Sequence, residues 1–197
     1  MFDTMPTDTL RKPPARDRLL AAADELFYAE GVHTVGIDRV IERAGVAKAS
    51  LYSSFGNKEG LVTAYLEGKH ERRRARLLSG LADYPDPRAR LLGVFDVLAG
   101  MLDQPDFRGC AFYNASAEST AGGPVQEVCD NARAWTRGLF TELARDAGVA
   151  EPELLAEQLI VLYDGAMVGA RMDRRPGTAT VARATAEALV DAAIRRS

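Results

Sequence analysis

The segment from Gly31 to Leu61 constrains the fold most, because its apolar residues keep helical spacing on both sides of a glycine. One buried helical face is indicated by the i, i+3, i+4, i+7 spacing of Ile37, Val40, Ile41 and Ala44. Gly45 follows, and glycine adopts the left-handed backbone conformation of a sharp bend without a Cβ clash. Beyond it, Leu51 and Phe55 lie four residues apart and give the next short helix a single buried seam. The segment therefore predicts two short helices across a tight turn.

The unburied side of the second short helix carries small, hydroxyl-bearing and cationic residues, namely Lys48, Ala49, Ser50, Tyr52, Ser53 and Ser54. A narrow helix of this kind fits the major groove of duplex DNA. We expect Lys48 and the Tyr52 hydroxyl to contact phosphates. Ala49, Ser50 and Ser53 would face base edges, with Ala49 against a thymine methyl. The alternative is an ordinary helical hairpin inside an all-helical core.

The run AGVAKASLYSSFGNKEGL resembles the DNA-binding module of the TetR family of bacterial repressors. The likeness rests on the small residue–Gly–Val turn, a Lys, the Leu-Tyr pair, a Phe and Lys-Glu-x-Leu, within residues 15–65. It implies a three-helix domain, with Lys58 as a further phosphate contact. Gly36 stands where the family usually opens the second helix with Thr or Ser. The hydroxyl cap is therefore missing, and only the backbone N–H of Gly36 is left to contact DNA at this position. Ser54 replaces a commoner His or larger residue.

The composition is that of an ordinary soluble protein, with 197 residues, 47% hydrophobic and 27% charged, enough for one large or two small domains. No window approaches the ~18 apolar residues of a membrane span, and the N-terminus has no apolar signal core. We therefore expect a cytoplasmic protein without membrane contact. Residues 1–80 carry 13 Lys and Arg against 11 Asp and Glu, and residues 81–197 carry 12 against 17. The small positive excess agrees with a DNA-binding first half.

The sequence carries no signature of catalysis or metal binding. The Gly-x-Ser-x-Gly, phosphate-loop, dinucleotide-binding and His-Glu-x-x-His patterns are missing. The two cysteines, Cys110 and Cys129, and the two histidines, His33 and His70, do not have zinc-site spacing, and a cytosolic disulfide is not expected. We expect no enzyme activity, no cofactor and no metal.

Turn residues divide the chain into about nine expected helices, so the predicted fold class is all-α. We expect a disordered arm over residues 1–14, a helix-turn-helix domain over 15–57, a connecting fourth helix over 58–80, and an effector-binding and dimerisation domain over 81–197. Arg11, Lys12 and Arg16 either reach the DNA or belong to a solvated tail. The Arg-rich middle of the fourth helix is expected to be largely solvated.

The last two helices, from Pro152 and from Thr178, contain many small residues and leave an apolar stripe uncovered. Small residues let helix backbones approach closely. We expect these helices to pair with their copies across a twofold axis as a four-helix bundle. The alternative is packing within one chain only.

The family's second domain usually binds an effector, and the resemblance implies the same here; the RGC-AF-NASAE run, residues 108–118, is similar to one branch of the family. The candidate pocket residues are Phe95, Met101, Phe107, Cys110, Phe112, Asn114, Glu118, Trp135, Tyr163 and Met167. Each could instead be ordinary core. Cys110 is either a redox sensor acidified by Arg108 or a small core residue.

The residues and the resemblance together predict a ligand-responsive repressor of the TetR type. It would bind a palindromic operator as a homodimer and be released when a small-molecule effector draws the fourth helix aside. A small-molecule carrier or enzyme of helical fold with an incidental helix-turn-helix is the alternative.

Overall fold

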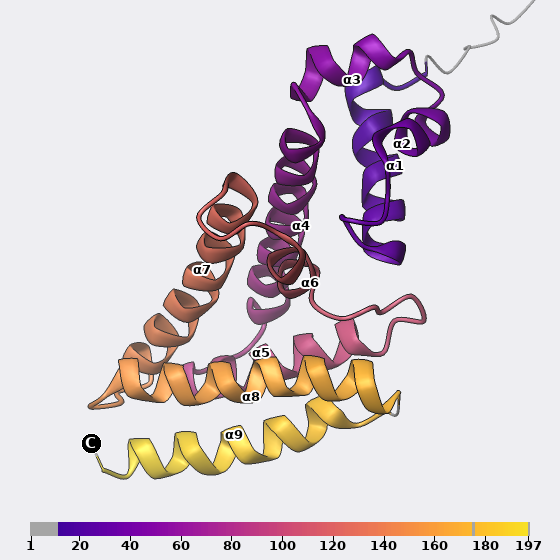
Figure 1. The fold of residues 1–197 in the computed structure, drawn as a ribbon. Helices are drawn as coiled ribbons and strands as arrows, with labels where there is room; N and C mark the ends of the chain where they lie inside the picture. Colours follow the sequence, from indigo (N-terminus) through magenta and orange to yellow (C-terminus); the bar gives the residue numbers. More distant parts are fainter. Residues whose placement is uncertain (1–11, 175, 197) are drawn as a thin grey trace, which may run out of the picture.

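A computed structural model describes residues 12–174 and 176–196, and the regular structure in these ranges is all α-helical (Figure 1). The helices of this part are α1 (Ala15–Glu30), α2 (Ile37–Ala44), α3 (Lys48–Phe55), α4 (Lys58–Leu81), α5 (Pro87–Leu102), α6 (Ala111–Glu118), α7 (Pro124–Asp146), α8 (Pro152–Asp173) and α9 (Thr178–Ile194). The all-α prediction is therefore confirmed. Residues 1–11 of the expected arm, including Arg11, lie outside the described residues.

Helices α1, α2 and α3 form a three-helix unit, called here the DNA-reading unit, around a small apolar core. The side chains buried in it include Leu19, Phe27, Val40 and Leu51. The chain turns between α2 and α3 at Gly45, whose φ of 61° is the predicted left-handed bend. Arg18 of α1 holds this bend, because its guanidinium donates to the carbonyl oxygens of Ala44 at 3.1 Å and Gly45 at 2.9 Å.

Local caps separate α3 from α4. Gly56 follows α3 with a φ of 73°, a conformation that favours glycine. The side chain of Asn57 accepts a hydrogen bond from the Gly60 N–H at 2.8 Å. This bond satisfies one of the N–H groups that a helix start leaves without a backbone partner.

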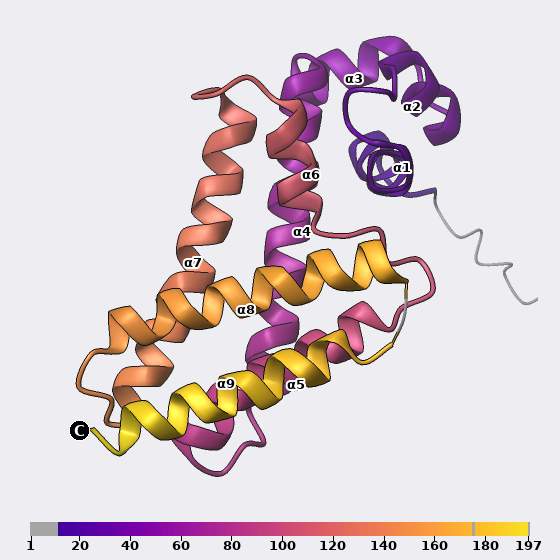
Figure 2. The same ribbon diagram turned by 60° about the horizontal axis from the view of Figure 1, so that its bottom comes forward.

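Two apolar clusters hold the chain together, and α4 belongs to both. The N-terminal cluster joins the DNA-reading unit to the start of α4, to α6 and to the first half of α7. The C-terminal cluster joins the end of α4 to α5, α8, α9 and the second half of α7. The two clusters thus meet within α4 and α7. Helices α5, α8 and α9 run side by side across the ends of α4 and α7 (Figures 1 and 2).

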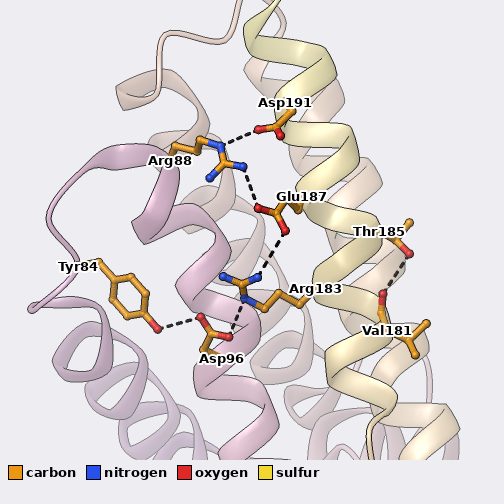
Figure 3. A network of polar contacts seen from close by, with 8 residues as sticks. All are labelled: Tyr84, Arg88, Asp96, Val181, Arg183, Thr185, Glu187 and Asp191. Atoms are coloured by element: carbon orange, nitrogen blue, oxygen red, sulfur yellow. Dashed lines mark hydrogen bonds and ion pairs between the residues drawn. The ribbon is translucent and has the colours of Figure 1, made fainter.

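Polar contacts attach α9 to α5 along one side (Figure 3). Arg88 donates to Asp191 at 2.6 Å and to Glu187 at 2.9 Å, and the hydrogen bond from Arg88 lowers the pKa of Asp191. Arg183 pairs with Asp96 at 2.8 Å. Asp96 also accepts a hydrogen bond from the Tyr84 hydroxyl, as Figure 3 shows. These pairs bridge two helices far apart in the sequence.

Three fully buried rings, those of Phe95, Phe140 and Tyr163, form the centre of the C-terminal cluster. The ring centroids lie 5.9 Å apart for Phe95 and Phe140, 6.4 Å for Phe95 and Tyr163, and 6.0 Å for Phe140 and Tyr163. These separations are those of favourable tilted and edge-to-face aromatic pairs. Among the described residues, no helix is both long and apolar enough to span a membrane.

Candidate DNA-binding surface and ligand cavity

Helix α3 is anchored on one side and open on the other. Leu51 is fully buried in the N-terminal cluster, and Phe55 is half-buried beside it. The opposite side presents Tyr52, which is 46% exposed, together with exposed Ala49 and Ser53. Ser50, which was expected on this open side, is half-buried, and its carbonyl oxygen accepts a hydrogen bond from the Ser53 hydroxyl at 3.2 Å. The open side of α3 is therefore short, and apart from Tyr52 it carries only small exposed side chains.

Lys48, the cation expected at the start of α3, forms an exposed ion pair on the surface. The Lys48 ammonium lies 2.9 Å from the Asp38 carboxylate of α2, and both side chains are exposed. The hydrogen bond to Asp38 raises the pKa of Lys48, which keeps it charged at neutral pH. Because exposed ion pairs contribute little stability, Lys48 can exchange Asp38 for a phosphate at small cost.

Lys58 and Gly36 occupy the other positions expected at the DNA. The Lys58 ammonium points to the carbonyl oxygen of His33 at 3.2 Å, and its partial burial lowers its pKa. Gly36 precedes α2 in an extended conformation without a side-chain cap, and a Cβ added at this position would meet open space. The guanidinium of Arg16, near the start of α1, lies over the ring of Phe55 at 5.3 Å. The basic start of α1 is therefore next to the end of α3.

A cavity of about 580 Å³ lies between α4, α6, α7 and α8. Half of the expected pocket residues line it, namely Cys110, Phe112, Asn114, Tyr163 and Met167. Cys110 is half-buried in the wall, and both cysteines are free thiols. A cavity of this size is within the range of small-molecule sites.

The other expected pocket residues lie elsewhere. Phe95 is enclosed in the C-terminal cluster, and Trp135 packs against it while its ring faces His70. Phe107 lines a separate, more polar hollow beside α9. Glu118 faces the DNA-reading unit, and Met101 is half-buried on α5. Helical spacing marks a residue as inward-facing, but it does not say which neighbouring helix or cavity that side meets.

Sequence reasoning missed Arg73, which reaches the cavity from α4. It was grouped with the solvated arginines of this helix. Its spacing gives the signal that identifies it, because Leu66, His70, Arg73 and Leu77 follow the i, i+4, i+7, i+11 register of the buried side. Also missed were Cys129 and Thr136 of α7, which line the same cavity.

Helix α6 bonds the DNA-reading unit at both of its ends. The carboxylate of Glu118, its last residue, accepts a hydrogen bond from the His33 N–H at 2.7 Å. Just before the helix, the N–H of Arg108 donates to the Tyr28 hydroxyl at 2.9 Å, and that hydroxyl donates to the Gly109 carbonyl oxygen at 3.1 Å. Since α6 also lines the cavity, one short helix connects the cavity wall to the DNA-reading unit.

His70 of α4 lies between the rings of Phe112, at 6.3 Å, and Trp135, at 5.6 Å. Burial and, secondly, the charge of Arg73 lower its pKa below the usual 6.5. The folded state then binds fewer protons than the unfolded state as pH falls below about 6.5, so stability decreases there by at most about 1.4 kcal/mol per pH unit. We expect urea unfolding to show this decrease in the free energy of unfolding. Below the folded-state pKa of His70 the free energy stops falling on its account, because both states then bind the proton.

Two single variants isolate the His70 contribution. His70→Gln removes the decrease assigned to this side chain, while the exposed His33→Gln serves as a matched control and retains it. An identical pH dependence of stability in the native protein and in His70→Gln would rule out this assignment.

Comparisons with known proteins identify relatives of this chain. Residues 19–65 match the family model described as bacterial regulatory proteins, tetR family. The crystal structure of SCO4454, a TetR-family transcriptional regulator from Streptomyces coelicolor, superposes with a TM-score of 0.80 at 33% identity, covering 92% of this chain and 95% of that one. LmrA, a helix-turn-helix transcriptional regulator of Bacillus subtilis, is 26% identical over 70% of this chain and 74% of its own.

The transcriptional activator FasR of Mycolicibacterium smegmatis is 28% identical over 140 residues, which are 71% of this chain and 64% of FasR, less than two thirds of that relative. Regulators of transcription thus recur in each comparison. The match to SCO4454 extends over nearly the whole of both chains, and it includes the helix-turn-helix whose exposed α3 was predicted from the sequence. The chain accordingly belongs to the TetR family of DNA-binding transcriptional regulators.

Proposed function

We propose that the protein is a ligand-responsive repressor that binds a palindromic operator as a homodimer and leaves it when a small molecule occupies the cavity. The observation that carries this proposal is the position of α6. This helix lines the cavity, and its last residue, Glu118, accepts a hydrogen bond from the His33 N–H. The loop just before it is hydrogen-bonded to Tyr28 of the DNA-reading unit.

The proposed switch is a shift between two populated spacings of the reading helices. The free dimer holds its two α3 helices one DNA turn apart, as paired half-sites require. An effector that fits the wider-spaced state better moves α6 and α4, and the wider state then predominates. A coupling of about 1–3 kcal/mol per site, acting at two sites, is enough to release the operator.

The proposed dimer interface is the outer side of α8 and α9. On α8 it consists of exposed Leu154, Val161, Val168 and Met172, and on α9 of exposed Val181, Ala184, Thr185 and Ala188. The inner side of α9 packs through Ala179, Ala182, Ala186 and Val190 instead. A contiguous apolar surface of this kind is typical of a protein–protein contact. Two copies would bury it as a four-helix bundle.

Binding to the operator would use the open side of α3. Lys48 and Tyr52 would contact phosphates, and Lys58 would do so after leaving the His33 carbonyl. Ala49, Ser50 and Ser53 would face base edges, and the free N–H of Gly36 would lie at the DNA backbone.

Retardation of the DNA upstream of the protein's own gene tests the proposal. We expect a retarded complex whose affinity falls steeply with salt, because binding releases counterions from the phosphates. A carrier or enzyme with an incidental helix-turn-helix would leave this DNA and random duplex equally unretarded. That outcome would favour the alternative.

Tyr52→Ala should weaken DNA binding by about tenfold without changing the fold or the dimer. Its side chain is exposed on α3, so the truncation removes a phosphate contact and no core packing. Fluorescence anisotropy should show a similar loss on operator and non-operator duplexes, since phosphate contacts do not read sequence. Leu78→Ala, which truncates an exposed side chain outside both the open side of α3 and the cavity, is the control and should bind DNA normally. Unfolding of Tyr52→Ala would mean that Tyr52 belongs to the core.

A further inference from the structure

The cavity combines apolar walls with polar groups that have no hydrogen-bond partner among the described residues. Its apolar lining includes Phe112, Ile160 and Met167. Two of the other lining residues, Arg73 and Tyr163, carry buried hydrogen-bond donors that no described group accepts. A buried donor without an acceptor is costly, so this pair indicates what a ligand must supply.

Arg73 brings a positive charge to the cavity. Its Nη2 donates to the Ala132 carbonyl oxygen at 2.9 Å and to the Thr136 hydroxyl at 3.1 Å, and its guanidinium lies over the Phe112 ring at 4.6 Å. These contacts fix the guanidinium plane but bring no negative charge. Its Nε is buried without an acceptor, and no carboxylate of the described residues forms an ion pair with Arg73. The charge is therefore left for a ligand to neutralise.

The carboxylates of the cavity wall are already engaged. Asp164 pairs with Arg133 at 2.6 Å, and Asp130 accepts a hydrogen bond from the Gln126 amide at 2.7 Å. Arg133 and Asp130 are exposed, so these contacts lie toward solvent and do not neutralise the inner cation.

Tyr163 supplies the second donor. Its side chain is 1% exposed, and its hydroxyl has no partner. Burial raises the pKa of Tyr163 to about 12, so the hydroxyl keeps its proton at neutral pH and can donate it in a hydrogen bond. Arg73 lines the same cavity, and its positive charge acts on this pKa in the opposite direction, with a smaller effect than burial.

We propose that the cavity binds a small monocarboxylic acid with an apolar body, whose carboxylate accepts hydrogen bonds from Arg73 Nε and the Tyr163 hydroxyl. The planar donors of the Arg73 guanidinium match a carboxylate. The other two arginines of the lining, Arg133 and Arg171, are exposed, so Arg73 is the cation of the cavity interior. The apolar walls fit the body of the molecule. An organic cation would meet Arg73 with like charge, and a neutral apolar molecule would leave both donors unsatisfied. The proposal names the effector class and rests on the proposed role of the cavity.

A matched set of four probes tests this on the full-length protein without DNA. 4-Phenylbutanoate and decanoate are compared with 4-phenylbutanamide and decanamide, which keep the shape and lose the charge. Binding is followed by calorimetry and by the fluorescence of Trp135, the single tryptophan, which is next to the cavity residue Thr136 in the sequence. We expect at least one acid to bind about 10- to 100-fold more tightly than its amide.

Variants of the two donors identify the site. Arg73→Gln should abolish the preference for acid over amide, whereas Arg73→Lys, which keeps the charge, should retain part of it. Tyr163→Phe should weaken acid binding by about threefold to tenfold. Arg76→Gln, which removes an exposed arginine of α4 outside the cavity lining, is the control and should keep the full preference. Circular dichroism and thermal unfolding establish that each variant is folded.

The outcomes separate this inference from the proposed function. Equal affinity for acid and amide, a preference that survives in folded Arg73→Gln, or no binding by any of the four probes would overturn the inference. If the acid binds through Arg73 but does not weaken DNA binding, the inference stands and the proposed switch fails. If DNA is released by other ligands while the acids do not bind, the switch stands and the inference fails.

Discussion

Replacing both Val161 and Val181 by aspartate is expected to convert the protein into a monomer and to weaken operator binding by at least about 100-fold. Each side chain is 69% exposed on the outer side of α8 or α9, so the change leaves the fold of the single chain intact. In the dimer, however, four carboxylates would be buried in an apolar contact without partners, which is strongly unfavourable. A monomer offers one reading helix to one half-site, so half of the specific contacts disappear.

Analytical ultracentrifugation measures the first effect, and fluorescence anisotropy with an operator duplex measures the second. Leu78→Asp is the matched control, because Leu78 is an exposed apolar residue of α4 outside the proposed interface. It should remain dimeric and bind DNA normally. A dimer that persists in the double variant would place the interface on another surface.

Replacing Phe95 by alanine is expected to lower the free energy of unfolding by about 3–5 kcal/mol. Phe95 is fully buried, and its ring packs against those of Phe140 and Tyr163. Its truncation removes both aromatic contacts and leaves a void that closely packed neighbours fill only partly. Urea unfolding followed by circular dichroism measures the loss.

The exposed Leu78→Ala provides the control and should change stability by less than about 0.5 kcal/mol. A loss below about 1 kcal/mol in Phe95→Ala would mean that this ring is not part of the tightly packed core. In that event the sequence-based assignment of Phe95 to a ligand pocket would regain support.

The helices and their ends were predictable from the sequence because their signals are local. Gly45 adopts the left-handed bend, Asn57 caps α4, and Asp86 caps α5 ahead of a proline at its first turn. The buried Leu51 and exposed Tyr52 of α3 follow directly from helical spacing. Each of these features depends on residues within one or two turns, so no knowledge of tertiary contacts is needed.

The cavity was only half predictable, because its composition depends on which helices meet. Arg73 is one of several arginines in a row. Helical spacing assigns it to the buried side of α4, but only the packing of α4 against α7 shows that it reaches the cavity. Cys129 and Thr136 are equally ordinary in sequence. Conversely, Phe95 and Trp135 carry the aromatic character expected of a pocket, yet their sides of α5 and α7 meet other packed side chains.

The DNA-reading unit shares its apolar cluster with α6 and α7, and this has a consequence for protein engineering. Tyr65 and Leu66 of α4 belong to one cluster with Phe112, Ala115, Val125, Cys129 and Ala132. A chimaera that joins residues 12–81 to a foreign receptor domain would therefore expose apolar surface that the native chain covers. Grafting this DNA specificity onto another sensor requires the matching side of α6 and α7 to be transplanted along with the helix-turn-helix.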